Sequence, residues 1–413
     1  MTRPDADLLV VGGGPVGLAA AVEAALRGMS VVVFEPRRSP VDKACGEGLM
    51  PGAVAARARL GGQPGGRRLD GIAYLAADGS SRAAHPFRAG AGLGVRRTSL
   101  VTALGARAEA LGVPVVADRV LGLVQDGAGA RVDLATGGRW HGRWVLGCDG
   151  LRSRTRALAG IASRTDGRRF GLRRHALVRP WSRHVEVHWS PGGEAYVTPV
   201  SADSVGVAVL TSQPAGFEAL LRSFPLLQAR LDGVEWLSEA RGAGPLHRHV
   251  ERRTSGRVLL AGDAAGYVDA LTGEGLRIGF ESARAAVDAV QRADPAGYER
   301  RWREITRTYR LVTRALLGLG GSPLTRAAVA PGAAVLPGVF GLAVDALAGG
   351  RATIGRMPRG VPVVPPPRDR EGGRDWGGRL SIDDSGRDDG NGRCEDGALG
   401  DGLDEKLLTG DDR

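Results

Sequence analysis

Near its N-terminus the chain alternates short apolar runs with a helical pattern. Residues 7–11 (DLLVV) form an apolar run, a glycine-rich turn follows, and the alanine- and leucine-rich stretch 18–26 favours a helix. A second apolar run, 30–34, comes next. Strand, helix and strand in this order predict a parallel β-α-β unit and therefore an α/β fold.

Two later regions show other periodicities. Residues 185–199 alternate apolar and polar positions, which predicts a second sheet. From residue 298 onward the apolar positions are instead spaced by four and three, which predicts one face of a long helix with arginines on the other side. These apolar positions are Tyr298, Trp302, Ile305, Tyr309, Val312, Leu316 and Leu319.

The stretch 327–344 carries no charge over 18 residues, which raises the question of a membrane span. Pro331, Pro337 and Gly338 interrupt it, and alanine is its commonest residue. A packed or interfacial helical hairpin is therefore favoured over a transmembrane helix. Peripheral membrane contact of this segment is an expectation of the sequence.

The turn after the first apolar run is Gly12-Gly13-Gly14-Pro15-Val16-Gly17, a G-x-G-x-x-G motif. Gly12 permits the tight turn, Gly14 lets a pyrophosphate approach the backbone, and Gly17 lets helix and strand pack closely. Glu35, at the end of the second run, is placed to accept hydrogen bonds from the adenosine ribose. An acid there disfavours a 2′-phosphate, so the motif predicts FAD or NAD rather than NADP.

Two further motifs make the prediction specific. Residues 144–156 form a strand that ends in Asp149-Gly150, and residues 257–266 form a strand that ends in Gly262-Asp263 at the start of a helix. With the glycine loop they resemble the three fingerprints of the FAD-dependent hydroxylase superfamily, the para-hydroxybenzoate hydroxylase-like flavoproteins that include geranylgeranyl reductases. The resemblance implies that Asp263 binds the ribityl chain of FAD. Asp149 and Gly150 would lie near its ribose and pyrophosphate, although helix capping by Asp149 stays open.

The resemblance implies more FAD contacts. Arg97, in a V-x-R-x-x-L helix start, would lie beside FAD, and Val120 would pack near the adenine or in the core. Residues 43–49, with Cys45 and Gly46, and residues 272–276 would lie at the flavin ring. The second segment would open a helix whose N-terminal amides stabilise the reduced ring. Its glycines, Gly273 and Gly275, allow that approach.

The fold predicted on this basis is α/β, with a Rossmann-type FAD-binding domain, an inserted β-sheet substrate domain and C-terminal helices. The stretch 368–413 has 8 basic and 14 acidic residues and few apolar ones, so it cannot offset the entropy of ordering. The predicted division is 1–165 FAD-binding domain (with part of the substrate sheet at 68–95), 166–254 substrate-domain sheet, 255–296 FAD-binding domain continued, 297–360 C-terminal helices and 361–413 disordered acidic tail.

The composition bears on nucleic-acid binding, on thiol and metal chemistry and on the cellular location. The net charge is +11, yet all basic residues except Lys43 and Lys406 are arginines, scattered and without aromatic interleaving. This pattern fits a GC-rich genome and does not predict nucleic-acid binding. The three cysteines form no Cys-x-x-Cys pair, and no His/Cys cluster has the spacing of a metal site. The N-terminus lacks a signal-peptide pattern, so we expect a cytoplasmic protein, with membrane association left open.

The chain also resembles actinobacterial FAD-dependent monooxygenases over nearly residues 5–350. This resemblance implies a monooxygenase that hydroxylates a lipophilic aromatic or polyketide-type substrate with NAD(P)H and oxygen through a flavin C4a-hydroperoxide. A second dinucleotide fingerprint is absent, so NAD(P)H would bind transiently. The two segments expected at the flavin ring carry C-G-x-G and T-G-E-G motifs, which geranylgeranyl reductases favour. A geranylgeranyl reductase-like ene-reductase that saturates isoprenoid double bonds is therefore the alternative.

Two other functions are less favoured, halogenation and flavin binding without turnover. Halogenation would need a lysine between flavin and substrate, for which only Lys43 is available, and a flavin-binding protein without turnover also stays open. No catalytic residue is predicted, because flavin enzymes use the protein mainly to orient the cofactor and exclude water. Candidate acids or hydrogen-bond donors, each with a buried structural role as the alternative, are Glu47, His175, His188 and Tyr196. The oligomeric state is not predicted.

Overall fold

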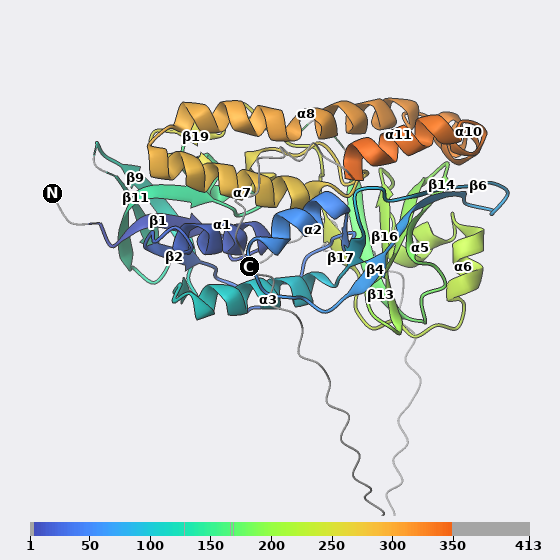
Figure 1. Cartoon of the computed structure of the whole chain (residues 1–413), viewed down its shortest axis with the longest axis horizontal. Coiled ribbons are helices and arrows are strands. Elements are labelled where there is room, and N and C mark those ends of the chain that lie inside the picture. The colour runs from blue at the N-terminus through green and yellow to red at the C-terminus, as the bar shows by residue number, and fades with distance from the viewer. Residues whose placement is uncertain (1–3, 128, 166, 168, 349–413) are drawn as a thin grey trace, which may run out of the picture. The chain divides into compact units, whose positions relative to one another are not determined.

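Two large β-sheets organise the chain (Figure 1), and each is covered by its own helices. The structure is a computed structural model that describes residues 4–127, 129–165, 167 and 169–348. The predicted tail, 361–413, lies outside the described residues. The α/β class expected from the sequence is confirmed.

The first sheet has eight strands and a parallel centre, in which β1 (Ala6–Val11) lies between β2 (Val31–Phe34) and β11 (Arg139–Gly147). Its other strands are β8 (Val115–Val116), β9 (Val120–Gln125), β10 (Ala130–Leu134), β19 (Thr254–Ser255) and β20 (Val258–Leu260). The strands β1, β2, β11 and β20 are parallel, so their carboxyl ends meet at one edge. The three motifs of the sequence follow β1, β11 and β20 at this edge.

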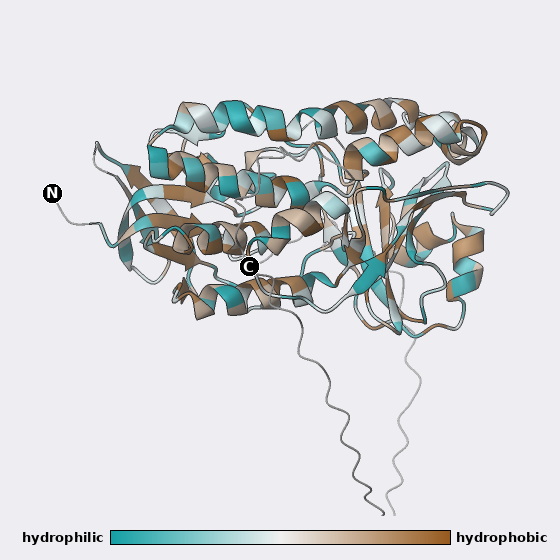
Figure 2. Cartoon of the chain, viewed as in Figure 1, coloured by the Kyte–Doolittle hydropathy of each residue, from teal (hydrophilic) through white to brown (hydrophobic). Residues whose placement is uncertain are grey.

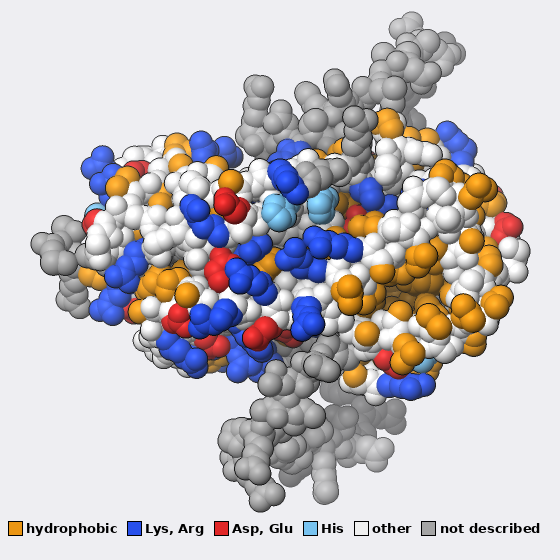
Figure 3. Space-filling view, turned by 90° about the horizontal axis from the view of Figure 1, so that it is seen from above, with side chains coloured by type: hydrophobic (Ala, Val, Ile, Leu, Met, Phe, Trp, Pro, Cys, Tyr) orange, Lys and Arg blue, Asp and Glu red, His pale blue; other side chains and the backbone are white. Residues whose placement is uncertain are grey.

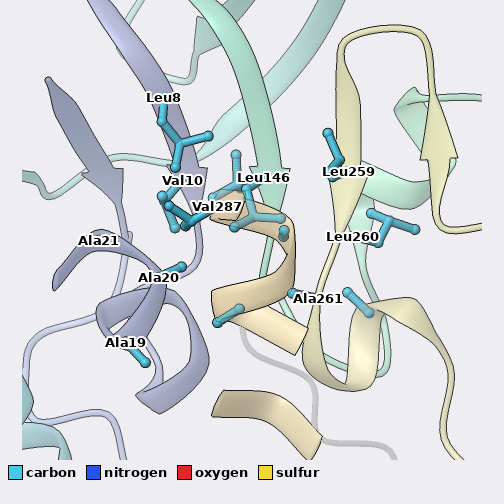
Figure 4. Packing of buried hydrophobic residues seen from close by; sticks show 14 of the residues in the cluster. Leu8, Val10, Ala19, Ala20, Ala21, Leu146, Leu259, Leu260, Ala261 and Val287 are labelled. Atoms are coloured by element: carbon cyan, nitrogen blue, oxygen red, sulfur yellow. The ribbon is translucent and has the colours of Figure 1, made fainter. Parts of the chain in front are cut away.

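Helices cover the first sheet on its faces. The helix α1 (Pro15–Ala25) follows the glycine loop and packs against α3 (Arg97–Ala110) and α7 (Gly275–Arg292). Figure 4 shows Val10 and Leu146 of the sheet beside Val287 of α7, with the alanines of α1 on the neighbouring helix. The small alanine side chains let α1 lie close to the sheet, which holds the glycine loop in a fixed place.

The second sheet has seven strands and is antiparallel except for the pair β5 and β14. Its order is β17 (Arg241–Ala243), β13 (Phe170–Leu177), β16 (Ser204–Thr211), β15 (Gly193–Pro199), β14 (His184–Ser190), β5 (Gly71–Ala76) and β6 (Arg82–Pro86). The alternation read in residues 185–199 therefore corresponds to strands β14 and β15. One face of the sheet packs on α5 (Phe217–Leu221) and α6 (Pro225–Leu231).

Smaller elements connect the two sheets. A three-stranded sheet comprises β3 (Gly48–Leu49), β7 (Gly92–Gly94) and β4 (Arg67–Leu69), and β12 (Ser163–Arg164) pairs with β18 (His249–Val250). Two short helices are α2 (Pro51–Ala58) and α4 (Arg154–Leu158).

The third motif differs from its prediction. Asp263 lies in a short 3₁₀ helix, Gly262–Ala265, and the following α-helix, α7, begins only at Gly275.

The first C-terminal helix packs along α7, and the shorter helices after it cover the open face of the second sheet. The long helix α8 (Pro295–Leu319) has the predicted amphipathic spacing, and its apolar face is buried. It is followed by α9 (Pro323–Ala327), α10 (Val329–Val335) and α11 (Pro337–Ala348). In Figure 2 the strands of both sheets are largely hydrophobic, whereas α3, α7 and α8 carry many hydrophilic residues.

Among the described residues, no single helix has the length and apolar character that crossing a bilayer requires. The pair α10 and α11 meets that requirement only when taken together, and it is bent by 108° at the break between the two helices. The uncharged stretch 327–344 therefore forms a bent helical pair rather than a straight span.

Candidate functional site

A single chamber of about 650 Å³ connects the carboxyl edge of the first sheet with the open face of the second. Its walls come from all three sequence motifs, from the 43–49 turn, from β14, β15 and β16, and from α8 to α11. The predicted FAD contacts that line it are Gly14, Cys45, Gly46, Arg97, Asp149, Gly150, Asp263, Gly273 and Gly275. The chamber thus unites residues that are more than 250 positions apart in the sequence.

The glycine loop has the geometry that the motif predicts. Gly12 has φ +109°, and a Cβ there would lie 2.7 Å from the carbonyl oxygen of Cys148. A Cβ on Gly17 would lie 1.8 Å from the carbonyl oxygen of Gly12, so no larger residue fits. Gly14 faces open space, and its nearest neighbour would be Arg97 Nη2 at 3.6 Å. The space at Gly14 is where a pyrophosphate would approach the backbone.

Three cations lie beside this space. Arg37, Lys43 and Arg97 all line the chamber, and a Cβ on Gly150 would lie 3.2 Å from Lys43 Nζ. Burial lowers the pKa of Lys43, and the nearby Asp263 carboxylate opposes that effect. A pyrophosphate carries negative charge, which this set of cations and the N-terminus of α1 would balance. The residues present therefore fit FAD.

Two of the predicted acidic contacts, Glu35 and Asp149, differ in how far their oxygens are already hydrogen-bonded. Glu35 is buried, and its carboxylate accepts hydrogen bonds from Gly13 N at 2.9 Å and from Arg37 Nε at 2.8 Å. Asp149 is not the N-cap residue of α4, but its Oδ2 accepts a hydrogen bond from Thr155 N in the first turn of that helix at 2.9 Å. Its Oδ1 is buried and has no hydrogen-bond partner among the described residues. Since buried carboxylate oxygens are rarely unsatisfied, Asp149 Oδ1 fits a hydroxyl donor of the cofactor.

Arg156 holds the second and third motifs together. Its guanidinium is buried and donates hydrogen bonds to the carbonyl oxygens of Leu151 at 2.9 Å and Ala264 at 3.1 Å. The local fold depends on Ser153, whose side chain caps α4 by accepting from Arg156 N. The cross-link fixes the distance between Asp149 and Asp263, the two acids assigned to the ribose and ribityl ends of FAD.

The two segments expected at the flavin ring both lie in the chamber wall. Thr272, Gly273 and Gly275 line it where α7 begins, so the free N–H groups of that helix end face the chamber. Gly273 has φ +67°. In the other segment Gly46 has no atom within 4 Å of a Cβ, and Thr198 Oγ1 donates to its carbonyl oxygen at 2.8 Å. This arrangement leaves room for a planar ring between the two turns.

Glu274, between the two glycines of that turn, is buried beside Arg277, and burial raises the pKa of its carboxyl to about 7. The folded protein therefore retains a proton that the unfolded chain, with a pKa near 4.5, releases. The free energy of unfolding should fall by on the order of 3 kcal/mol as the pH rises between these values. We expect Glu274→Gln to abolish this fall, as measured by urea unfolding of the holoenzyme at pH 5 and pH 8.

The matched control is Glu281→Gln, which removes the other carboxylate paired with Arg277, one that is 30 % exposed. This variant should keep the pH dependence of the wild type. If Glu274→Gln and the wild type lose stability in parallel as the pH rises, Glu274 is ionised in the folded protein and the assignment is wrong.

A buried acid–base pair stands at the chamber wall. Glu47 lines the chamber, and its Oε2 lies 2.7 Å from Nε2 of His175 on β13. On the other side of the imidazole, Nδ1 lies 3.1 Å from Oγ of Ser238, a partly exposed residue. Arg173 Nη1 also lies 3.0 Å from that Nδ1. Glu47 has φ +57°, an uncommon backbone conformation for a residue with a side chain.

The other residues weighed from the sequence are placed as follows. Tyr196 lines the chamber and donates its hydroxyl to the carbonyl oxygen of Leu271 at 2.7 Å, and burial raises its pKa well above the ordinary value. His188 lies on the opposite face of β14 from Val185 and Val187, is fully buried and does not line the chamber. Val120 lies in the core of the first sheet and is likewise absent from the chamber wall. The structure therefore supports the core role for Val120.

Beyond the two turns the chamber is almost wholly aliphatic. The second sheet contributes Ile72, Val185, Val187 and Leu210, and the C-terminal helices contribute Leu316, Val329, Leu336, Phe340 and Leu347. The second sheet also contributes two tyrosines to this wall, Tyr74 and Tyr196. Apolar walls with few polar groups favour a lipophilic ligand, since there is little to offset the desolvation of a polar one.

Sequence reasoning missed four parts of the site. They are the place of Arg37 in the chamber wall, the position of Lys43 beside Gly150, the Arg156 cross-link and the pairing of Glu47 with His175. A signal existed for Lys43, because it is the only lysine outside the C-terminal tail in a chain otherwise basic through arginine. Among the described residues, no group of His, Cys, Asp or Glu side chains could hold a metal ion.

Comparison with known proteins gives a family match over most of the chain. Residues 5–290 match the model of the FAD binding domain. A menaquinone reductase of Mycolicibacterium smegmatis is 30 % identical over 331 residues, 72 % of this chain and 79 % of that protein. A rifampicin monooxygenase of Streptomyces venezuelae is 32 % identical over 67 % of this chain, which spans 62 % of that longer relative.

Among solved structures, the flavin-dependent halogenase CmlS superposes with a TM-score of 0.70 at 20 % identity, over 79 % of this chain and 68 % of that one. At this identity the likeness concerns the fold alone. The comparisons thus agree with the sequence on FAD and on the fold, and they include both a monooxygenase and a reductase.

Proposed function

Because the chain belongs to the FAD binding domain family and is an FAD-dependent oxidoreductase, we propose that it is a monooxygenase that hydroxylates a lipophilic phenolic ring. The observation that carries the proposal is the chamber itself. It joins the FAD-binding edge to an aliphatic cavity and has one buried acid–base pair, Glu47 and His175, at its wall.

The net reaction consumes oxygen and a nicotinamide donor. One oxygen atom of O₂ enters the ring in place of hydrogen as a hydroxyl group, and the other leaves as water. NAD(P)H supplies the hydride and a proton comes from solvent, so atoms and electrons balance. When bound, FAD would supply the redox chemistry that connects the donor to oxygen.

The chain's own residues would activate the ring by moving a proton. A phenol becomes more electron-rich when it loses its proton, and Glu47 is the carboxylate that faces the chamber from the 43–49 turn. Its Oε2 would accept the phenol proton. His175 would then take that proton at Nε2 and release its own proton from Nδ1 to Oγ of Ser238, which is partly exposed. General-base assistance of this kind contributes roughly 10²- to 10⁴-fold to a rate.

The second sheet would keep water away from the reacting ring. Val185, Val187 and Leu210 roof the chamber, and each is no more than 4 % exposed. Reactive oxygen species formed in flavin chemistry are lost to water unless the site is dry. The aliphatic wall of α8 to α11 would hold an alkyl or isoprenoid chain attached to the ring, which makes an alkylphenol or a phenolic polyketide the favoured substrate class.

A second function, saturation of an isoprenoid double bond, is favoured by a separate observation. The relative that matches this chain over 79 % of its own length is a menaquinone reductase, and the chamber wall is as suitable for a polyprenyl chain as for an alkylphenol. In that reaction NAD(P)H gives a hydride and Glu47, replenished through His175, gives a proton to the two carbons. Oxygen is not consumed.

Oxygen uptake and NADPH oxidation, measured together, distinguish the two functions. With a long-chain alkylphenol we expect NADPH oxidation to rise about tenfold above the rate without substrate, with equimolar oxygen uptake and a product one oxygen heavier. With a polyprenyl quinone under nitrogen we expect no oxidation. Under nitrogen, a product in which a double bond of the polyprenyl chain, and not the quinone ring, has gained two hydrogens would replace the first function by the second. No response to either compound would leave a flavin-binding protein.

A further inference from the structure

The most exposed apolar side chains of the molecule gather at one place. Among the described residues the seven most exposed large hydrophobic side chains, between 57 % and 85 % exposed, all fall within residues 311–342. Other exposed hydrophobics reach at most 52 %. Six of the seven lie at or beyond the end of α8, and together we name them the apolar rim: Leu319, Leu324, Val335, Leu336, Val339 and Leu342.

The apolar rim surrounds the way into the chamber. Leu319, Leu336 and Val339 are exposed and also line the chamber, so the same side chains face both solvent and the substrate cavity. Figure 3 shows hydrophobic side chains gathered around a hollow on the side of the molecule where α10 and α11 lie. Contiguous apolar patches on a protein surface mark sites that bind another protein or a membrane.

The chain around the rim is uncharged, and its flank is basic. Between residues 315 and 344 the one charged residue is Arg326, and its guanidinium is tied inward to the carbonyl oxygens of Pro191 and Gly320. On α8, Arg307 and Arg314 are exposed on the same side of the helix as Leu311, which is 71 % exposed. An apolar centre with arginines beside it is complementary to the acyl region and the anionic headgroups of a bilayer.

We propose that the apolar rim docks on an anionic lipid bilayer, with α10 and α11 lying in the interface and the chamber opening into the acyl region. The 108° bend keeps the two helices from crossing the bilayer as one span. Phe340, Val344 and Leu347 are buried and anchor α11 to the protein. A lipophilic molecule could then pass from the bilayer into the chamber without crossing water. A second copy of the chain is a weaker occupant, since pairing two rims would close both openings and bring like charges together.

The test measures binding of the holoenzyme to sedimenting vesicles, without substrate or turnover, so it is independent of the proposed reaction. We expect the wild type to bind vesicles that contain phosphatidylglycerol and to bind pure phosphatidylcholine more weakly. The triple variant Leu324→Ser, Val335→Ser, Leu342→Ser changes rim residues that do not line the chamber. It should bind at least about tenfold more weakly.

Two further variants separate the contributions. Arg307→Gln with Arg314→Gln should weaken binding to anionic vesicles by roughly fivefold per arginine and leave binding to phosphatidylcholine unchanged. The matched control, Val115→Ser, Leu121→Ser, Val124→Ser, removes exposed hydrophobics of β8 and β9 away from the rim, and it should bind as the wild type does. Retained FAD absorbance and melting temperature show that each variant is folded.

The proposal is overturned if the wild type stays in the supernatant with both kinds of vesicle, or if the rim variant and the control bind equally well. Sedimentation velocity tests the alternative that a second copy of the chain binds the apolar rim. A dimer that the rim variant dissociates, with no vesicle binding by the wild type, would assign this face to self-association instead.

Discussion

Replacing Gly14 with valine is expected to give a folded protein that purifies without FAD. The backbone at Gly14 has φ −75° and ψ 179°, which any residue adopts, and a Cβ there meets no atom closer than 3.6 Å. The fold should therefore tolerate the change. The valine side chain would instead fill the space of the pyrophosphate and remove its charge-assisted hydrogen bonds, which raises the dissociation constant for FAD roughly a hundredfold.

Two other glycines serve as controls for this experiment. Gly17→Ala should lower the melting temperature sharply as well as remove FAD, because its Cβ would overlap the carbonyl oxygen of Gly12 at 1.8 Å. Gly105→Ala, in α3 with no atom within 4 Å, should leave FAD content unchanged and keep or slightly raise the melting temperature. Visible absorbance and thermal unfolding read out the two properties separately. Stoichiometric FAD in the Gly14→Val protein would show that the cofactor does not lie on this loop.

Replacing Glu47 with glutamine is expected to lower kcat by roughly 10²-fold or more while FAD content and melting temperature stay near the wild-type values. The amide is isosteric and still accepts the hydrogen bond that Arg97 N donates to Oε1 at 2.9 Å. It cannot take up a proton from a ring substrate, so turnover should fall although the cofactor stays bound.

The partner residue provides the internal check. His175→Gln should lower kcat by a similar factor, and the double variant should be no slower than either single variant, because the two groups act on one proton. Ser238→Ala should have a smaller effect, since water could replace its hydroxyl at the partly exposed end. Wild-type kcat in both single variants would mean that Glu47 and His175 only hold the 43–49 turn in place.

The local motifs could be predicted because each depends on neighbours in sequence. The glycine loop, Glu35 and the flanking strands all lie within about thirty residues, so spacing alone indicates a phosphate-binding β-α-β unit. The alternation in residues 185–199 likewise reports a sheet directly. The bend between α10 and α11 follows from Pro337, which cannot continue the preceding helix.

The chemistry of the site depends on contacts between distant segments, which no spacing reveals. Glu47 and His175 are 128 residues apart and meet only because β13 lies beside the 43–49 turn. Arg156 reaches Ala264 across 108 residues. Conversely, the adenine role suggested for Val120 came from the resemblance, whereas its burial in the core follows from packing of β9 against α4.

The chamber and the apolar rim suggest one route for a lipophilic molecule, from the bilayer past Leu336 and Val339 to the roof formed by β14 to β16. The polar and charged groups lie at the other end, around Gly14 and Lys43. If the rim docks as proposed, this separation would place the predicted FAD-binding residues away from lipid and the apolar residues toward it.

The most direct test of the proposed function is turnover of a long-chain alkylphenol by the holoenzyme with NADPH under ¹⁸O₂, followed by mass spectrometry of the product. The proposed monooxygenase incorporates a single ¹⁸O atom into the ring. A product that gains two hydrogens and no oxygen, or one whose new oxygen atom is unlabelled and therefore comes from water, would contradict it.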